Sequence, residues 1–149
     1  MVSNTINDLF KDLEHQPLAS NLLKASLKSN RVAPAYLFYG PKGVGQKIFA
    51  IRFLEGLIAG GLKKEGTRSR LEKLNHPDLL WVEPTYINEG KLIHKSKAST
   101  QGIKSKVLPQ IRMEQIREIK RFLSKKPVEA KLGMIVLEDV EEMNEAASN

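Results

Sequence analysis

The strongest indication of architecture in this chain is the segment Ala35-Tyr-Leu-Phe-Tyr-Gly-Pro-Lys-Gly-Val-Gly-Gln-Lys47. Its first five residues, Ala35–Tyr39, are apolar or aromatic and predict a buried strand. Three glycines follow within six residues, and the apolar spacing over residues 48–59 then predicts a helix. A strand, a glycine-rich loop and a helix in this order are typical of a loop that binds phosphate groups.

The loop has the glycine spacing of a nucleotide-binding loop but lacks two of its side chains. After the second glycine, a working loop has Lys and then Ser or Thr, whereas this chain has Gln46 and Lys47. The amide of Gln46 is neutral, and Lys47 cannot ligate magnesium. A shift of one residue would let Lys47 supply the missing charge, but not the magnesium ligand. We therefore predict a degenerate nucleotide-binding loop. Its residues are Gly40, Pro41, Lys42, Gly43, Val44, Gly45, Gln46 and Lys47.

Two acids at the end of an apolar segment suggest the second half of a nucleotide site. Glu138 and Asp139 directly follow the apolar residues 134–137. In a working ATPase, such an acid helps to hold magnesium. The same acids would also suit the first turn of a following helix, where negative charge is favoured. Because they occur together with the glycine loop, we interpret Glu138 and Asp139 as a Walker B-like pair. We do not expect the site to hydrolyse ATP efficiently.

The whole pattern predicts an α/β fold with a mainly parallel sheet flanked by helices. Further strands are expected over residues 79–83 and 134–137. Helices are expected over 3–14, 17–30, 48–59 and 112–124, and from residue 142 onward. The polar stretches 62–75 and 84–108 are expected to be loops.

Apolar spacing also predicts which side chains of the helices are buried. For the first four helices these are Ile6, Leu9, Phe10 and Leu13; Leu18, Leu22, Leu23 and Leu27; Phe49, Phe53, Leu54 and Leu57; and Met113, Ile116, Ile119 and Leu123. Arg117, Lys120 and Arg121 are expected to face solvent. In the turn at residues 76–78, Asp78 is expected to accept hydrogen bonds from nearby backbone.

Composition indicates an ordinary globular protein and excludes several kinds of chemistry. The chain has 149 residues, 41% hydrophobic and 28% charged, enough for one domain with a core. It has no apolar run of membrane-spanning length and no secretory signal, so we expect a cytoplasmic protein. The absence of cysteine excludes disulfides, thiolate catalysis and cysteine-ligated zinc. The three histidines lie far apart in sequence, which argues against a metal site.

The net charge of +7 is distributed unevenly. Residues 91–126 contain eleven Lys or Arg against two Glu, whereas residues 127–149 contain one Lys against six acids. A basic segment of this size could contact a nucleic-acid backbone. It could equally be a solvated loop and an exposed helix face, because no aromatic residues alternate with its charges.

Five separated segments occur in the order found in one known family. They are Leu9-Phe-Lys-Asp-Leu with Gln16-Pro-Leu-Ala-Ser-Asn-Leu-Leu; Ala35-Tyr-Leu-Phe-Tyr-Gly-Pro-Lys-Gly-Val-Gly45; His76-Pro-Asp-Leu-Leu-Trp-Val-Glu-Pro84; Gln110-Ile-Arg-Met-Glu-Gln-Ile-Arg-Glu-Ile119; and Ile135-Val-Leu-Glu-Asp-Val-Glu-Glu-Met-Asn-Glu-Ala-Ala147. Together they resemble the delta-prime subunits of the bacterial DNA polymerase III clamp loader, particularly those of cyanobacteria. The resemblance covers nearly the whole chain.

This resemblance implies an AAA+ fold and a role in DNA replication. Its implied partners are the gamma or tau and delta subunits of a heteropentameric clamp loader and, through that assembly, the sliding clamp and primer-template DNA. Delta-prime subunits act largely as stators while partner subunits use ATP. They often have a defective nucleotide site, which Gln46 and Lys47 fit. The resemblance therefore implies part of a DNA-directed DNA polymerase holoenzyme with no catalytic residues of its own.

The chain departs from the family pattern in two ways. Many members have a four-cysteine zinc module where this chain has the basic residues 60–75, so no zinc is expected. The chain also ends at Asn149, before the family's sensor 1 strand, serine-arginine-cysteine motif, lid and collar domains. We therefore expect residues 1–149 to form one incomplete AAA+ domain, truncated at its C-terminus.

Two other functions remain open from the sequence. The first is an active AAA+ ATPase, which Lys47 and Glu138 support and the missing hydroxyl residue opposes. The second is a basic nucleic-acid-binding module acting through Lys91–Lys126. Neither function requires a membrane.

Overall fold

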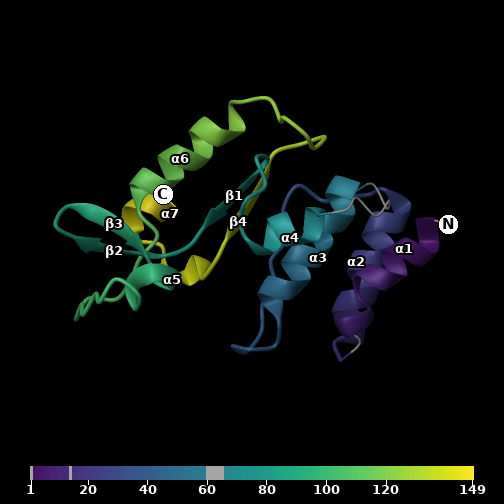
Figure 1. Ribbon diagram of the computed structural model, residues 1–149, viewed down its shortest axis with the longest axis horizontal. Coiled ribbons are helices and arrows are strands. Elements are labelled where there is room, and N and C mark those ends of the chain that lie inside the picture. The colour runs from purple at the N-terminus through teal and green to yellow at the C-terminus, as the bar shows by residue number, and fades with distance from the viewer. Residues whose placement is uncertain (1, 14, 60–65) are drawn as a thin grey trace. The chain divides into compact units, whose positions relative to one another are not determined.

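The computed structural model describes residues 2–13, 15–59 and 66–149. They form two compact units, Met1–His76 (unit 1) and Pro77–Asn149 (unit 2), each of which is described by itself. The described part of unit 1 is helical, whereas unit 2 contains the strands (Figure 1). The predicted α/β class is thereby confirmed at the level of a small parallel sheet with helices. No described helix is long and apolar enough to cross a membrane.

Unit 1 consists of helices packed around an apolar core. Its elements are α1 (Val2–Leu9), the 3-10 turn η1 (Lys11–Leu13), α2 (Pro17–Ser29), α3 (Gln46–Ala59) and α4 (Thr67–Glu72). Pro17 occupies the first turn of α2, where a missing backbone N–H costs nothing. Asn30 ends α2 in a left-handed conformation, with a φ of 53°.

The core of unit 1 joins α1, η1, α2 and α3. Its buried members are Leu9, Phe10, Leu13, Leu23, Phe49 and Phe53. Phe10 is fully buried, and its ring centroid lies 6.4 Å from that of Phe49. The predicted apolar side of residues 3–14 is confirmed, since Ile6, Leu9, Phe10 and Leu13 are all buried.

The predicted burial of α2 is wrong at two of its four leucines. Leu18 and Leu22 are 74% and 63% exposed, whereas Leu23 is buried and Leu27 is partly buried against the core. Successive helix positions are rotated by about 100°, so four leucines at these spacings cover more of the helix surface than its neighbours do. The buried side is completed by Ser20, whose hydroxyl donates to the carbonyl oxygen of Leu13 at 2.9 Å.

The predicted buried strand Ala35–Tyr39 is also wrong. The segment is neither strand nor helix, and Leu37 and Tyr39 are 79% and 94% exposed. Tyr36 holds it against the helices, because its ring lies edge-on to Phe53 at a centroid distance of 4.7 Å. A strand requires a hydrogen-bonded neighbour, and the described residues of unit 1 contain no other extended segment that pairs with it.

Helix α4 forms within residues 62–75, which the sequence predicts as a loop. Gly66 precedes α4 with a φ of 79°, and Leu71 is fully buried. Leu71 is the one apolar residue in α4, so no periodic pattern reveals this short helix. Residues 60–65 lie outside the described residues.

Unit 2 contains a two-stranded parallel sheet, an antiparallel hairpin and short helices. Its elements are β1 (Leu79–Val82), β2 (Thr85–Asn88), β3 (Lys91–His94), α5 (Lys95–Ala98), α6 (Met113–Leu123), β4 (Met134–Leu137), η2 (Val140–Glu142) and α7 (Glu145–Ser148). Strands β1 and β4 pair in parallel, with Leu79 opposite Met134 and Val82 opposite Leu137. The predicted strands at 79–83 and 134–137 and their parallel pairing are therefore confirmed.

The predicted loop over residues 84–108 is wrong for its first half. Strands β2 and β3 form an antiparallel hairpin, which α5 follows directly. The hairpin turn is Glu89-Gly90, with φ angles of 49° and 75°. A two-residue hairpin loop with a type I′ turn requires positive φ at both central residues, and glycine at the second position adopts it without strain.

Helix α6 confirms the predicted exposure of Arg117, Lys120 and Arg121. Its last predicted inward residue, Leu123, is instead 57% exposed. Gln115, in the first turn of α6, is buried, which apolar spacing does not predict. Its amide nitrogen donates to the carbonyl oxygen of Glu83 at 2.8 Å, so a polar contact joins α6 to the end of β1.

Candidate functional site

The glycine loop lies in unit 1 and leads directly into α3. Gly43 and Gly45 have φ angles of 89° and 96°, which a residue with a Cβ adopts only with strain. The backbone N–H of Phe49 donates to the carbonyl oxygen of Gly45 at 3.0 Å and so begins the helical pattern. The loop-to-helix part of the motif is therefore present, although the strand before it is not.

Gln46 is the side chain that shapes this loop. Its Nε2 donates to the carbonyl oxygens of Gly40 and Pro41, at 2.9 and 3.1 Å. The amide thus folds back and ties the start of the loop to the first turn of α3. Lys47, at the position of the hydroxyl residue, is exposed and carries no acceptor for a cation.

The acidic pair lies in unit 2, beyond the carboxyl end of β4. Glu138 continues the parallel ladder, since its N–H donates to the carbonyl oxygen of Val82 at 2.8 Å. Its carboxylate accepts a hydrogen bond from the indole Nε1 of Trp81, also at 2.8 Å. Glu138 is therefore held against β1 by a neutral donor.

Asp139 has a cationic partner that the sequence does not reveal. Its Oδ2 lies 2.6 Å from Nζ of Lys95, the first residue of α5. The hydrogen bond to Asp139 raises the pKa of Lys95 above its ordinary value of 10.5, in opposition to the smaller effect of burial. Lys95 is therefore fully charged at neutral pH and neutralises Asp139.

Glu83 provides a second link between α5 and the sheet. It follows β1, and its carboxylate accepts hydrogen bonds from the backbone N–H and the hydroxyl of Ser96, at 3.2 and 2.6 Å. Nδ1 of His94 lies 3.4 Å from the same carboxylate. Because the carboxyl ends of parallel strands meet at one edge of a sheet, Glu83, Glu138 and Asp139 all belong to that edge.

Sequence reasoning missed Lys95 and Ser96, and with them the contacts of Glu83, because it treated residues 84–108 as a loop. The alternation in Thr85–Asn88 and Lys91–His94 around Glu89-Gly90 is the signal that could have identified the hairpin and thereby the position of α5.

The side chains of the glycine loop and of the acidic pair do not suit the magnesium ion that a working P-loop ATPase uses. Magnesium prefers oxygen ligands, whereas Lys47 offers only donors and Asp139 is paired with Lys95. Among the residues that the structure describes, no group of three or more His, Cys, Asp or Glu side chains could hold a metal ion. The loop and the acids belong to different units, and each is described within its own.

Replacing Lys95 with Met should lower the free energy of unfolding by about 0.5–1 kcal/mol, the usual worth of a partly exposed ion pair. Urea unfolding would measure the loss, and the Lys95→Met, Asp139→Asn double variant should lose less than the two single losses added. Because the pKa of Lys95 is raised on folding, its contribution is complete below pH 10.5 and disappears as the pH rises above the raised value.

Lys97 in the same short helix is exposed and provides the matched control. Lys97→Met should leave the unfolding free energy almost unchanged. Equal losses in the Lys95 and Lys97 variants would show that the contact with Asp139 contributes nothing.

Two comparisons with known proteins give matches. The sequence model of the family described as DNA polymerase III, delta subunit, matches residues 15–149. DNA polymerase III subunit delta' of Bacillus subtilis (strain 168) is 28% identical over 141 residues, which cover 91% of this chain and 36% of that protein. The chain therefore spans about a third of the length of this relative. No solved structure matches.

Proposed function

Because this chain belongs to the DNA polymerase III delta subunit family, we propose that it acts in DNA replication as a delta-prime-like subunit of a clamp loader. The observation that carries this proposal is the family match over residues 15–149. The identity with a delta' subunit supports delta-prime rather than another subunit. The proposed partners are the gamma or tau and delta subunits and, through the assembly, the sliding clamp and primer-template DNA.

Within this role, the chain contributes an AAA+-like domain whose nucleotide site does not hydrolyse ATP. Three features support a stator rather than an ATPase: a neutral amide at position 46, a lysine at position 47, and the pairing of Asp139 with Lys95. The partner subunits would then supply the hydrolysis that loads the clamp. The proposal places the protein in the cytoplasm, without zinc and without polymerase activity of its own.

A basic nucleic-acid-binding module is the second candidate function. One face of α6 presents Arg117, Lys120 and Arg121, which together with Glu114 line a hollow of about 540 Å³. The charge of this face would suit a phosphate backbone.

The nucleotide proposal is tested by titrating the full chain with magnesium-ATP beside the double variant Gln46→Lys, Lys47→Thr. We expect no turnover by the natural chain. The variant should bind ATP at least about tenfold more tightly, because a charge-assisted hydrogen bond to phosphate contributes roughly 1.5–3 kcal/mol. Binding is measured by calorimetry and turnover by phosphate release.

Circular dichroism of both proteins is the control for folding. The variant Gln46→Met removes the hydrogen bonds of Gln46 to the loop without adding a charge, so it separates the effect of losing these contacts from the effect of the new lysine. Turnover by the natural chain would overturn the stator proposal and assign the catalytic charge to Lys47. Clamp-loader membership has its own test, which is co-elution of the chain with gamma or tau and delta subunits in size-exclusion chromatography. Absence of any complex under conditions where those subunits associate would contradict it.

A further inference from the structure

The outer edge of the hairpin β2–β3 in unit 2 is open. In Figure 1 the two strands project together, and within the described residues β3 pairs with β2 alone. Thr85 exchanges two backbone hydrogen bonds with Gln110 on the far side of β2, at 2.9 and 3.0 Å. Its partner in β3, His94, therefore directs its backbone groups outward as well, and so does Leu92 two residues earlier.

This edge offers backbone groups to another chain. The outward N–H and C=O of Leu92 have no partner in the part of the chain that the structure describes. An extended segment can add to such an edge as a further strand, and its affinity then comes from backbone hydrogen bonds and its specificity from alternate side chains.

One face of the hairpin is apolar and exposed. Ile87 and Leu92 lie directly opposite each other, so their side chains share a face, and they are 56% and 37% exposed. Leu108, which is 72% exposed, precedes by two residues the Gln110 that pairs with Thr85. The chain thus approaches β2 with a third exposed apolar side chain. Contact with apolar side chains of a partner would remove this surface from water.

The charges beside the hairpin are almost all positive. Residues 85–108 contain five lysines and one acid, Glu89. Lys95 is paired with Asp139. The other four lysines are exposed and have no ion-pair partner among the described residues; they are Lys91, Lys97, Lys104 and Lys106. This excess of positive charge attracts an acidic partner and opposes a basic one.

The alternation of side chains along β3 fits both properties to one added strand. Lys91 lies on the opposite face from Leu92. A strand beside β3 that alternates apolar and acidic residues would place its apolar side chains next to Leu92 and its acids next to Lys91. A lysine on an edge strand also opposes pairing with the same edge of a second copy. Nucleic acid fits less well, because the exposed apolar side chains are aliphatic, whereas bases stack on aromatic ones.

We propose that the outer edge of β3 binds an acidic, apolar segment of a partner protein as an added strand. The segment pairs with the backbone of Leu92, its acids contact Lys91 and the neighbouring lysines, and its apolar side chains cover Leu92 and Ile87. This interaction goes beyond the proposed function, because it requires neither the nucleotide loop nor a clamp-loader assembly.

The test is fluorescence anisotropy of a labelled peptide, Glu-Leu-Glu-Ile-Asp-Leu-Glu, titrated with the full chain. A surface of this size binds weakly, so a dissociation constant on the order of 10–100 μM is expected. A peptide with lysine in place of each acid should bind at least about tenfold more weakly. Lys91→Glu should weaken binding of the acidic peptide about 5- to 10-fold and strengthen binding of the basic one, because an attraction becomes a repulsion.

Leu92→Pro tests the backbone contact. Proline removes the outward N–H of residue 92 without removing a hydrogen bond between β2 and β3, so the hairpin should persist while the added strand loses a bond. Binding of the acidic peptide should weaken about 5- to 10-fold. Leu92→Ala keeps this N–H and should weaken binding less. Circular dichroism checks that each variant is folded, and Lys91→Glu gives a reading even if Leu92→Pro unfolds.

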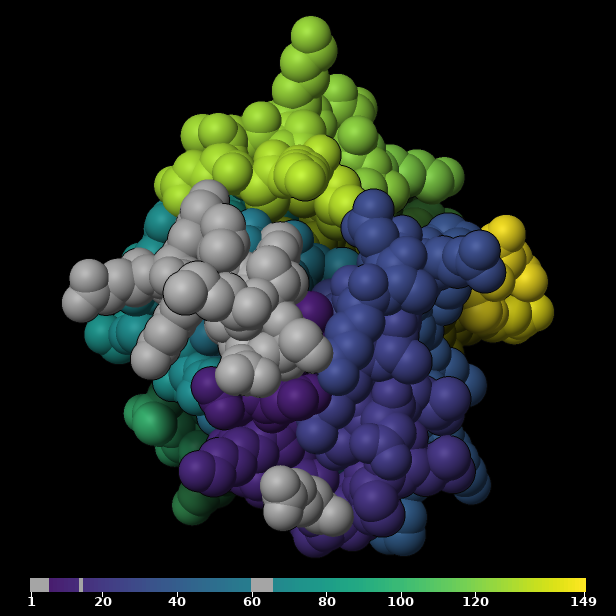
Figure 2. Space-filling model, turned by 90° about the vertical axis from the view of Figure 1, so that its right-hand side faces the viewer, coloured from purple at the N-terminus to yellow at the C-terminus, as the bar shows by residue number. Residues whose placement is uncertain are grey.

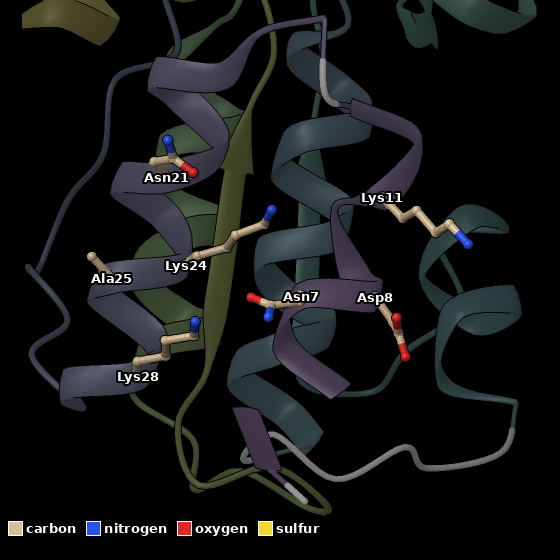
Figure 3. A pocket seen from close by; sticks show the side chains of 7 residues that line it. All are labelled: Asn7, Asp8, Lys11, Asn21, Lys24, Ala25 and Lys28. Atoms are coloured by element: carbon tan, nitrogen blue, oxygen red, sulfur yellow. The ribbon is translucent and has the colours of Figure 1, made fainter. Parts of the chain in front are cut away.

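The matched control is Lys28→Glu, which makes the same change of charge on α2 of unit 1. Lys28 is exposed and lines a hollow between α1 and α2, where Figure 3 shows it one turn from Lys24. The surface of α2 is blue-violet in Figure 2. Lys28→Glu should change the affinity for the acidic peptide by less than about threefold, the effect of net charge alone.

Absence of binding of the acidic peptide by the natural chain would overturn the proposal, as would equal losses in the Lys91 and Lys28 variants. Tighter binding of a mixed-sequence oligonucleotide, weakened by Lys91→Glu, would assign the lysines to nucleic acid instead. Concentration-dependent dimerisation that Leu92→Pro abolishes would assign the edge to a second copy. Failure of the chain to join other clamp-loader subunits would leave the peptide result unaffected, so the two proposals fail separately.

Discussion

Replacing Asp78 with Ala should lower the free energy of unfolding by about 3–5 kcal/mol, because the carboxylate accepts three hydrogen bonds in a buried position. Asp78 is 3% exposed. Its Oδ1 accepts from the N–H of Val128 at 2.6 Å, and its Oδ2 accepts from those of Glu129 and Ala130 at 2.7 and 2.6 Å. The side chain thus holds the segment between α6 and β4 against the start of β1.

The sequence predicts bonding of Asp78 to nearby backbone, and the structure adds three backbone donors that are distant in sequence. Val128, Glu129 and Ala130 lie 50, 51 and 52 residues further along the chain. The carbonyl oxygen of Asp78 also accepts a hydrogen bond from the N–H of Met134 at 2.8 Å, at the first step of the β1–β4 pairing. Loss of the side chain should consequently loosen this end of the parallel sheet.

Urea unfolding monitored by far-ultraviolet circular dichroism would measure the effect. Asp78→Asn keeps the shape of the side chain but removes its charge, so it should lower the free energy of unfolding by less than Asp78→Ala. If the Ala variant does not fold, the Asn variant still shows the direction of the effect. Glu118→Ala on the exposed face of α6 is the control, with an expected change within about 0.5 kcal/mol. An Asp78→Ala protein as stable as the Glu118→Ala protein would show that the three hydrogen bonds of the Asp78 carboxylate do not stabilise the fold.

The second large effect is expected at Phe10, where substitution by Ala should also cost about 3–5 kcal/mol. The side chain is fully buried where α1 and η1 meet the other helices of unit 1, and its ring faces that of Phe49. Removing the ring loses its transfer free energy and leaves a cavity that helices fixed at several contacts cannot fill. Amide hydrogen exchange in α2 and α3 would locate the loss in unit 1.

Two further variants make this prediction sharper. Phe10→Leu retains most of the volume and should cost about 1–1.5 kcal/mol, so it gives a reading even if Phe10→Ala unfolds. Leu18→Ala removes a leucine that the sequence predicts to be buried but that is 74% exposed, so it should cost less than about 0.5 kcal/mol. A cost of several kcal/mol for Leu18→Ala would show that this side of α2 is covered in solution.

The candidate site was only partly predictable from the sequence. The glycine loop, the beginning of α3 and the acids after β4 follow from spacing, because each depends on residues within a few positions of one another. The inward contacts of Gln46 and the pairing of Asp139 with Lys95 do not, although both determine what the segments offer to a ligand. Whether the loop and the acids act as one nucleotide site stays a prediction.

Sequence alone determined the elements whose signal is local. Apolar spacing indicated the helices containing Leu9, Leu23 and Phe49 and the strands at 79–82 and 134–137, since burial of one face imposes a period on the residues that form it. The family also follows from the sequence, because several motifs in a fixed order are more specific than any one of them.

Tertiary structure decided which faces and charges find partners. It left Leu18 and Leu22 exposed, gave Asp78 its partners at residues 128–130, and brought Lys95 to Asp139. The physical reason is common to all three: a helical period or a turn is set by neighbouring residues in the chain, whereas a contact depends on the path of the chain between distant residues.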